Sequence, residues 1–152
     1  MGGLFPLVIY LVQHRVVFVS FYSVIPTLFN PSSVAIALAK AYVRPDNRII
    51  EPYGIYHNEK IVGFFNLHYT PHSKDDFWLF HFFIDKKFQR KGLGAAAIKE
   101  LIKHIKTNHS SCHRIRLTVH PENHSGQTFY KKLGFTDDNI FTYDEFTYSI
   151  CI

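Results

Sequence analysis

The order of hydrophobic and polar residues after residue 50 predicts strands first. Residues 53–57 and 60–69 are rich in aromatic and β-branched side chains, and the two residues between them suit a tight hairpin turn. Residues 77–85 form a largely apolar run that is broken inside by His81, which predicts a buried central strand. The polar residues 70–76 are expected to form the loop before it.

A helix, a strand and a second helix are predicted next. Apolar and polar residues alternate from 114 to 120, which is typical of a strand. Residues 121–133 predict a short helix that ends at Gly134, and the tail beyond it predicts two further strands. The first helix is predicted to begin near Gly92, and its buried face consists of Ile98, Leu101, Ile102 and Ile105.

These elements indicate the fold class. Antiparallel hairpins flank a strand–helix–strand unit, so we predict one α/β (α+β) domain over residues 1–152. The length of 152 residues suits one domain and a core that needs no metal or disulfide staples. With 47% hydrophobic and 19% charged residues, the composition excludes a disordered or low-complexity chain.

The first 45 residues give a weaker pattern. Residues 4–12 and much of 16–29 are apolar, but neither run approaches the about 18 residues of a membrane-spanning helix. Their Val, Ile, Phe and Tyr content predicts buried strands, with a membrane anchor as the less favoured alternative. Asn30 is suited to cap a helix that must stop before Pro45. We expect no membrane partner.

Cysteine and histidine positions give little sign of a metal site. Cys112 and Cys151 are the only cysteines, so no disulfide framework is encoded and a reducing, cytoplasmic compartment is expected. Neither has a second cysteine at metal-ligand spacing. His120 and His124 are four residues apart, but Pro121 between them indicates a turn. We expect no bound metal.

The net charge of +5 is concentrated in one segment. Between Lys86 and Lys106 lie seven basic residues and one acid, so this segment carries +6 and the remaining chain −1. A local bias of this kind favours an anion site over general nucleic-acid binding. Two alternatives remain, a solvated helix face and a nucleic-acid module that uses the stripe of Lys99, Lys103 and Lys106.

The loop before the helix predicted to begin near Gly92 is suited to bind phosphate. Helix N-termini carry unpaired backbone N–H groups and a partial positive charge. Gly92 and Gly94 would allow a ligand to approach this backbone closely, and Arg90 and Lys91 add positive charge.

Three known phosphate-binding patterns differ in how well they match this loop. The P-loop pattern is absent. Residues 92–97 formally match the Rossmann pattern in its permissive form, but no acidic residue follows about 20 positions later. Residues 89–94 match Gln-x-x-Gly-x-Gly, the coenzyme A loop of the GNAT N-acetyltransferases, without strain.

From about Ala35 to the C-terminus, the chain resembles the GNAT acetyltransferases, most closely the spermine/spermidine (diamine) acetyltransferase-like group. The first roughly 30 residues do not match the usual first strand and helix of that family. The stretches that carry the resemblance are residues 53–56, 61–64, 83–94, 120–123 and 129–135.

The resemblance implies a mixed central sheet with splayed middle strands, flanked by helices, that admits acetyl-CoA as co-substrate. Tyr130 would be the general acid beside the thiol sulfur, and a phenol suits that role. The expected cofactor-binding residues are Phe82, Phe83 and Ile84 for the pantetheine arm, Gln89, Arg90, Lys91, Gly92, Leu93 and Gly94 for the pyrophosphate, and Asn123, Tyr130 and Lys132 beyond the splay.

The implied reaction is direct attack of a neutral primary amine on the thioester. Some relatives use a glutamate on the strand of residues 77–84 as the base, but here Phe80 occupies the matching position. His81, His120 and Glu122 acting through water are the alternatives. The expected acceptor is a small polyamine such as spermidine or spermine. Protein N-termini, lysine side chains, amino acids and aminoglycosides stay open.

Simpler interpretations stand beside these roles. Tyr130 could only pack, Asn123 could only cap a helix, and His81 could face another sheet residue. The acidic pairs 75–76, 137–138 and 144–145 are interpreted as solvated loops, with attraction of a polycation as the alternative. A coenzyme A-binding protein without catalysis is a further possibility. The related enzymes are often dimers, so a homodimer is one expectation, and no nucleic-acid partner is expected.

Overall fold

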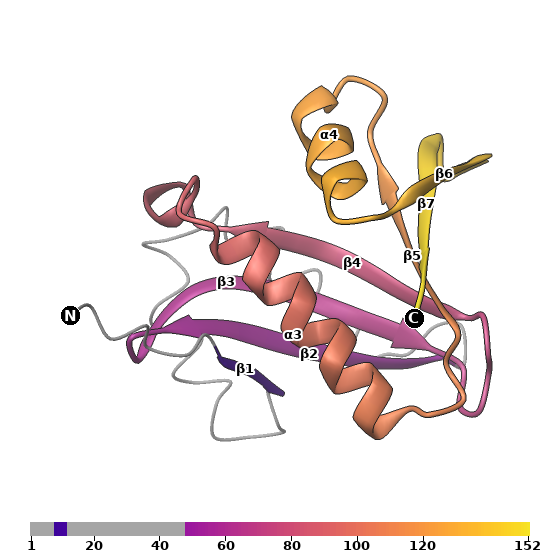
Figure 1. Ribbon diagram of the computed structural model, residues 1–152, viewed down its shortest axis with the longest axis horizontal. Coiled ribbons are helices and arrows are strands. Elements are labelled where there is room, and N and C mark those ends of the chain that lie inside the picture. The colour runs from indigo at the N-terminus through magenta and orange to yellow at the C-terminus, as the bar shows by residue number, and fades with distance from the viewer. Residues whose placement is uncertain (1–7, 12–47) are drawn as a thin grey trace.

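The computed structural model describes residues 8–11 and 48–152. The strand expected within residues 16–29 and the helix expected after Asn30 lie outside the described residues. Figure 1 shows a twisted sheet with a long helix crossing it and a second, shorter helix near the C-terminal strands. No helix within the described ranges is long and apolar enough to cross a membrane.

Seven strands form one sheet in the order β1-β2-β3-β4-β5-β7-β6. Neighbouring strands are antiparallel except for β4 and β5, which are parallel. The mixed α/β architecture predicted from the sequence is therefore confirmed. The strands are β1 (Val8–Leu11), β2 (Ile49–His57), β3 (Lys60–Tyr69), β4 (Phe77–Ile84), β5 (Arg114–Val119), β6 (Thr136–Thr142) and β7 (Glu145–Cys151).

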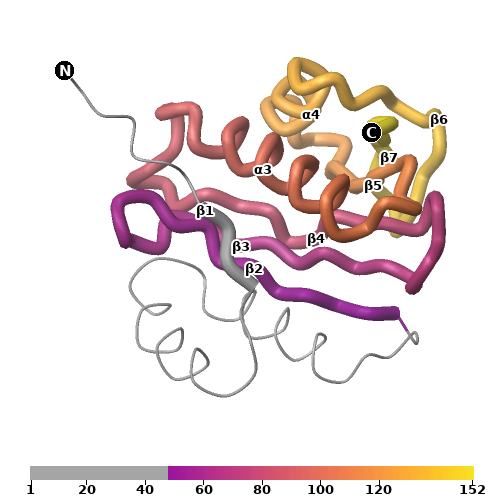
Figure 2. Tube along the Cα trace, turned by 60° about the horizontal axis from the view of Figure 1, so that its bottom comes forward, coloured from indigo at the N-terminus to yellow at the C-terminus, as the bar shows by residue number. Residues whose placement is uncertain are grey.

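Helices α3 (Leu93–Asn108) and α4 (His124–Lys132) lie on the same side of the sheet (Figure 2). A short 3-10 turn, Lys86–Phe88, precedes α3. The predicted hairpin turn between β2 and β3 is confirmed, because Asn58 and Glu59 have φ angles of 50° and 61°, as a tight type I′ turn requires.

The core lies between α3 and one face of the sheet. Alternate side chains of β3, β4 and β5 are buried there, while their neighbours in sequence point to the opposite face. The buried face of α3 is the predicted one, except that Ile102 is only half-buried. The buried residues that pack between α3 and the sheet include Leu67, Phe77, Leu79, Ile98, Leu101, Ile105, Ile115 and Leu117.

The two middle strands separate after a short paired stretch. Pairing of β4 with β5 runs from Phe77↔Ile115 to Leu79↔Leu117 and then ends, although β4 continues to Ile84. Figure 1 shows the two strands diverging beyond this point. The prediction of splayed middle strands is thus confirmed. The expected burial holds for Phe77 and Leu79 only. Trp78 is half-buried within the paired stretch, and residues 80–84, which lack a neighbour on one edge, are half-buried as well.

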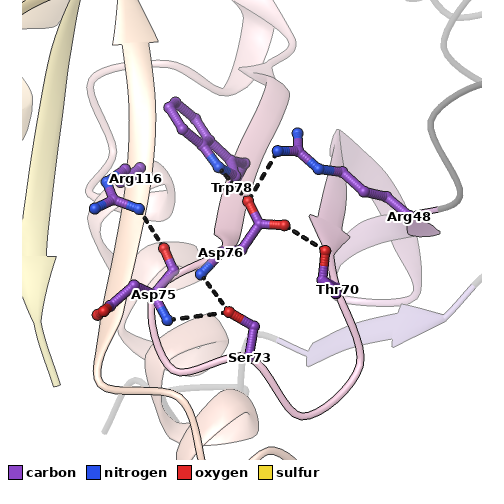
Figure 3. Close-up of polar contacts among 7 residues, drawn as sticks. All are labelled: Arg48, Thr70, Ser73, Asp75, Asp76, Trp78 and Arg116. Carbon is purple, nitrogen blue, oxygen red and sulfur yellow. Dashed lines mark hydrogen bonds and ion pairs between the residues drawn. The ribbon is translucent and has the colours of Figure 1, made fainter.

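A polar cluster holds the closed end of the splay (Figure 3). Asp76 accepts hydrogen bonds from Arg48 and from the indole of Trp78, each at 2.9 Å, and from Thr70 at 2.5 Å. Arg116 on β5 donates to the backbone carbonyl of Asp75. The loop before β4 is therefore tied to β5 where the strands still pair. Asp76 is half-buried and paired, which differs from the solvated loop expected for this acidic pair.

A β-bulge interrupts β4 where the splay opens. Phe80 pairs with Asn66 and Phe83 pairs with Phe64, so two residues of β4 face one of β3. His81 lies in the bulge with a φ of +53°, which is unusual for a residue other than glycine. Because side chains alternate along a strand, the bulge places Phe82 on the α3 face, the face that Leu79 also occupies.

Gly63 on β3 lies against the strand that follows the bulge. A Cβ atom at this position would lie 2.5 Å from the backbone carbonyl oxygen of Phe83, a contact that only backbone movement relieves. We expect Gly63→Ala to lower the free energy of unfolding by about 2 kcal/mol, as overpacking does. Urea unfolding measures this. The control is Gly94→Ala, which should cost less because the tightest contact of its Cβ is the movable Phe129 ring at 3.3 Å. Equal stabilities of wild type and Gly63→Ala would contradict the close strand packing.

Candidate functional site

A cavity of about 340 Å³ lies where β4 and β5 separate. Five residues predicted from the sequence line it together, although they come from distant parts of the chain: His81, Phe82, His120, Asn123 and Tyr130. The other lining residues are Leu79, Phe80, Leu117, Thr118, Val119 and Glu145. The splay therefore brings the predicted chemistry to one place.

The lining of this cavity comes from both faces of the sheet. Phe82 lies on the α3 and α4 side, with its ring centroid 6.5 Å from that of Tyr130. Thr118 lies on the opposite face, because it alternates with the buried Leu117 and Val119. A molecule in the cavity would reach through the sheet from one face to the other.

Tyr130 on α4 both packs and faces the cavity. Its ring contacts Phe129 and Phe135, with centroids at 5.0 and 5.6 Å, as well as Phe82. Burial in this aromatic surrounding raises the pKa of the phenol above its usual value of 10.0. Among the described residues, none forms a hydrogen bond with its hydroxyl group. The phenol is therefore protonated at neutral pH and available to a ligand.

The loop before α3 presents backbone amides that the protein does not use. Gly92 caps the helix with φ +76° and no side-chain hydrogen bond. Within the described part of the chain, the amides of Leu93, Gly94 and Ala95 have no acceptor, and the first backbone bond of the helix is from Ala96 to Gly92 at 3.0 Å. This end of α3 is therefore a suitable anion site.

Internal contacts fix the shape of this loop. The Gln89 side-chain amide donates to the carbonyl of Ile84 at 2.8 Å, and Asp85 accepts from the amide of Lys87 at 3.1 Å. Arg90 has a φ of +60°, so it shares the left-handed conformation with Gly92. Gln89 thus shapes the loop with its side chain.

Positive charge surrounds the same amides. Lys86, Lys87, Arg90 and Lys91 are all exposed, and within residues 48–152 none of them forms an ion pair. The Lys91 ammonium lies 5.5 Å from the ring centroid of Phe88. This charge is of the sign that a phosphate group requires.

Asn123 has the structural role of a helix cap. Its Oδ1 accepts from the amide of Gly126 at 2.9 Å and from the Ser125 hydroxyl at 3.1 Å. The same residue lines the cavity. Asn123 can therefore cap α4 through Oδ1 and still contact a ligand through the nitrogen of its side-chain amide.

The two candidate bases differ in their surroundings. His120 is exposed, and its Nδ1 accepts from the Glu122 amide at 3.2 Å, so a neutral His120 carries its proton on Nε2. His81 is half-buried in the bulge, with its ring centroid 6.5 Å from that of Phe80. Both line the cavity, whereas Glu122 does not.

Like the loop residues 89–94, the predicted residues Phe83, Ile84 and Lys132 do not line the cavity. Phe83 pairs with Phe64 across the sheet, and Ile84 lies against Gly94, with 3.6 Å between its Cγ1 and a Cβ built on that glycine. Lys132 is exposed in the last turn of α4. Phe83 and Ile84 nevertheless belong to the strand that borders the splay.

The sequence alone does not place Glu145 in the cavity wall, although it allows the acidic pair 144–145 to attract a polycation. The favoured interpretation of this pair is a solvated loop, but Glu145 is the first residue of β7, is half-buried and lines the cavity. The pairing of β7 with β5 brings it there, and no local pattern reveals a pairing between strands so distant in sequence.

Cysteines and metal ligands add no further site. Cys112 is buried and Cys151 exposed, and both are free thiols. Among residues 8–11 and 48–152, no three His, Cys, Asp or Glu side chains are grouped as metal ligands.

The model of the acetyltransferase (GNAT) family matches residues 20–135, and the chain belongs to this family. It is 34% identical over 90 residues to the spermine/spermidine N(1)-acetyltransferase of Bacillus subtilis (strain 168). It is 36% identical, also over 90 residues, to a probable spermine N(1)-acetyltransferase of Bacillus subtilis subsp. natto. Each match covers 56% of this chain and 59% of the relative, so the chain spans little more than half the length of these curated relatives.

Solved structures share the fold. The spermidine/spermine N-acetyltransferase SpeG from Vibrio cholerae has a TM-score of 0.68 at 15% identity and covers 96% of this chain and 92% of its own. The PaiA N-acetyltransferase from Thermoplasma acidophilum, in complex with coenzyme A, has a TM-score of 0.61 at 20% identity and covers 81% of this chain and 72% of its own.

Gly92 provides a test of the loop conformation. A Cβ atom there would meet nothing within 4 Å, so only the φ of +76° opposes substitution. We expect Gly92→Ala to lower the free energy of unfolding by about 1 kcal/mol, because side chains with a Cβ disfavour the left-handed region. Gly92→Asn should cost less, since asparagine tolerates this region. Chemical denaturation of both variants distinguishes them, and equal losses would contradict the backbone explanation.

Proposed function

We propose that this protein is an acetyl-CoA-dependent N-acetyltransferase that acts on a primary amine, and that the acceptor is a small polyamine such as spermidine or spermine. The observation that carries the proposal is the cavity between β4 and β5, with Tyr130 in its wall and unused amides at the start of α3. Family membership supports the reaction class.

The residues around the splay fit the parts of acetyl-CoA. The pyrophosphate would accept hydrogen bonds from the amides of residues 90–95, with Arg90 and Lys91 beside it. Space for the approach exists, because nothing lies within 4 Å of a Cβ built on Gly92. The pantetheine arm would run along the backbone of residues 82–84, with the Asn123 amide nearby. Coenzyme A is present in the solved PaiA structure of the same fold.

Tyr130 would act on the leaving group. A neutral amine attacks the thioester carbonyl, a C–N bond forms and the C–S bond breaks. The phenol donates its proton to the departing thiolate and recovers one when the ammonium intermediate is deprotonated. Its burial supports this role, because the phenol stays protonated at the pH of the reaction. A backbone N–H of β4 would stabilise the developing oxyanion.

The base that takes the amine's proton would be His81 or His120. Both line the cavity, and an imidazole is a side chain that can take up a proton near neutral pH. His120 would first have to release the Glu122 amide, which donates to its Nδ1 at 3.2 Å, because the tautomer that accepts through Nε2 carries its proton on Nδ1. Phe80 lines the cavity at the position where some relatives carry a glutamate.

The polyamine acceptor is supported by the two Bacillus relatives, whose names state spermine or spermidine as substrates. Protein N-termini are the second candidate. A neighbour of the same fold from Salmonella typhimurium, with a TM-score of 0.66 at 12% identity, modifies the N-terminal serine of a ribosomal protein. Polyamine acetylation is favoured because the sequence likeness is much greater for the polyamine enzymes.

Binding of acetyl-CoA tests the cofactor site. Titration calorimetry of the full chain should show saturable heat with acetyl-CoA, because the loop amides and the splay would both be engaged. NADH contains a pyrophosphate but no pantetheine arm, so it should compete weakly. Tighter binding of NADH than of acetyl-CoA would favour the Rossmann interpretation of the loop, and no heat with acetyl-CoA would refute the proposal.

Removing the Tyr130 hydroxyl tests the general acid. We expect Tyr130→Phe to lower kcat about 100-fold or more, with little change in acetyl-CoA affinity, because the ring packing persists. The control is Tyr148→Phe, which alters a buried tyrosine outside the cavity. Steady-state kinetics and calorimetry measure both quantities. Equal kcat values for wild type and Tyr130→Phe would exclude this role.

A further inference from the structure

Glu145 is the only carboxylate that lines the cavity within the described residues. It is half-buried, and no hydrogen bond or ion pair in the described ranges engages its carboxylate. No lysine or arginine lines the cavity either. A carboxylate removed partly from water, with no cation beside it, is expected to attract a cationic ligand.

The register of the sheet fixes the side on which Glu145 lies. Thr147 pairs with Thr118, so these two side chains share a face of the sheet. Glu145 precedes Thr147 by two residues and therefore lies on the same face. Phe82, the neighbour of Tyr130, lies on the opposite face. The acid and the phenol thus border the cavity from opposite sides of the sheet.

An aromatic surface lies on the Glu145 side. Phe80 shares this face with Trp78, and the two rings are stacked with centroids 5.9 Å apart. The ring of Tyr143, two residues before Glu145, has its centroid 6.5 Å from that of Phe80. Phe80 also lines the cavity. An aromatic ring beside a carboxylate is a favourable site for an ammonium group.

We propose that Glu145, with the ring of Phe80, binds a second ammonium group of the acceptor while its reacting amine lies on the Tyr130 side. Glu145 would then be a specificity residue that selects diamines and polyamines over monoamines. This inference rests on the proposed acetyltransferase function. It assigns recognition of the second ammonium group to a carboxylate on β7, whereas some relatives carry a carboxylate on the strand that corresponds to β4.

The test compares putrescine with butylamine, which share a four-carbon chain and differ in the second amine. The readout is the ratio of the two kcat/KM values for the full chain. We expect Glu145→Gln to lower this ratio about tenfold, because one charged contact in a half-buried cavity is lost. Phe80→Leu, which keeps an apolar side chain and removes the ring, should lower it a few-fold.

Two variants serve as controls. Asp144→Asn removes the adjacent carboxylate, which is exposed in the turn and does not line the cavity, so the ratio should stay at the wild-type value. Glu145→Asp retains the charge on a shorter side chain and should keep part of the selectivity. An unchanged ratio in Glu145→Gln, or an equal fall in Asp144→Asn, would overturn the proposal.

A binding measurement separates this proposal from the proposed function. If the wild type acetylates no amine, the acetyltransferase proposal fails, and putrescine is then titrated calorimetrically into the protein saturated with coenzyme A. Binding that is lost in Glu145→Gln but kept in Asp144→Asn would still support the cation site. Equal binding by wild type and Glu145→Gln, or no binding by the wild type, would refute it.

Discussion

The arrangement of this site depends on the point at which two parallel strands stop pairing. Beyond Leu79 and Leu117, one edge of β4 has no neighbouring strand among the described residues. Backbone polar groups that lose a partner must find another acceptor or donor, in solvent or in a ligand. The contact of Arg116 with the loop before β4 holds the closed end. At the open end, Phe129 of α4 lies against Gly94 of α3, which keeps the flanking helices together.

The site combines two opposite environments along one path. Around the start of α3 the surface is exposed and basic, and its amides are unused, which suits a group that stays charged and hydrated. Around Tyr130 the surroundings are aromatic and desolvated, which raises the pKa of the phenol and keeps it neutral. A ligand with an anionic end and an apolar, reactive end matches this gradient. Exchanging the two environments would desolvate the phosphates and hydrate the phenol.

Local patterns were sufficient for the hairpin, for α3 and for the loop before it, because these features depend on residues close together in sequence. The turn at Asn58 and Glu59 and the buried face of α3 are of this kind. The bulge at His81 was not predictable, since a break in register depends on how β3 and β4 pack. The place of Glu145 in the cavity was not predictable for the same reason: its environment is created by strand pairing and by a cavity, and neither leaves a local signature.

The bulge and Glu145 bear on one question, which is how this chain would bind the proposed cationic acceptor without an acid on β4. Because the bulge shifts the alternation, Phe82 faces Tyr130 while Phe80 stays on the other face with Trp78. An acid at position 80 would therefore lie on the same face as Glu145, in a cavity that already holds one carboxylate. Two neighbouring carboxylates would repel each other and raise the pKa of one of them. An aromatic ring at position 80 avoids this repulsion and can still attract an ammonium group, so Phe80 and Glu145 would together bind the proposed cation with a single negative charge.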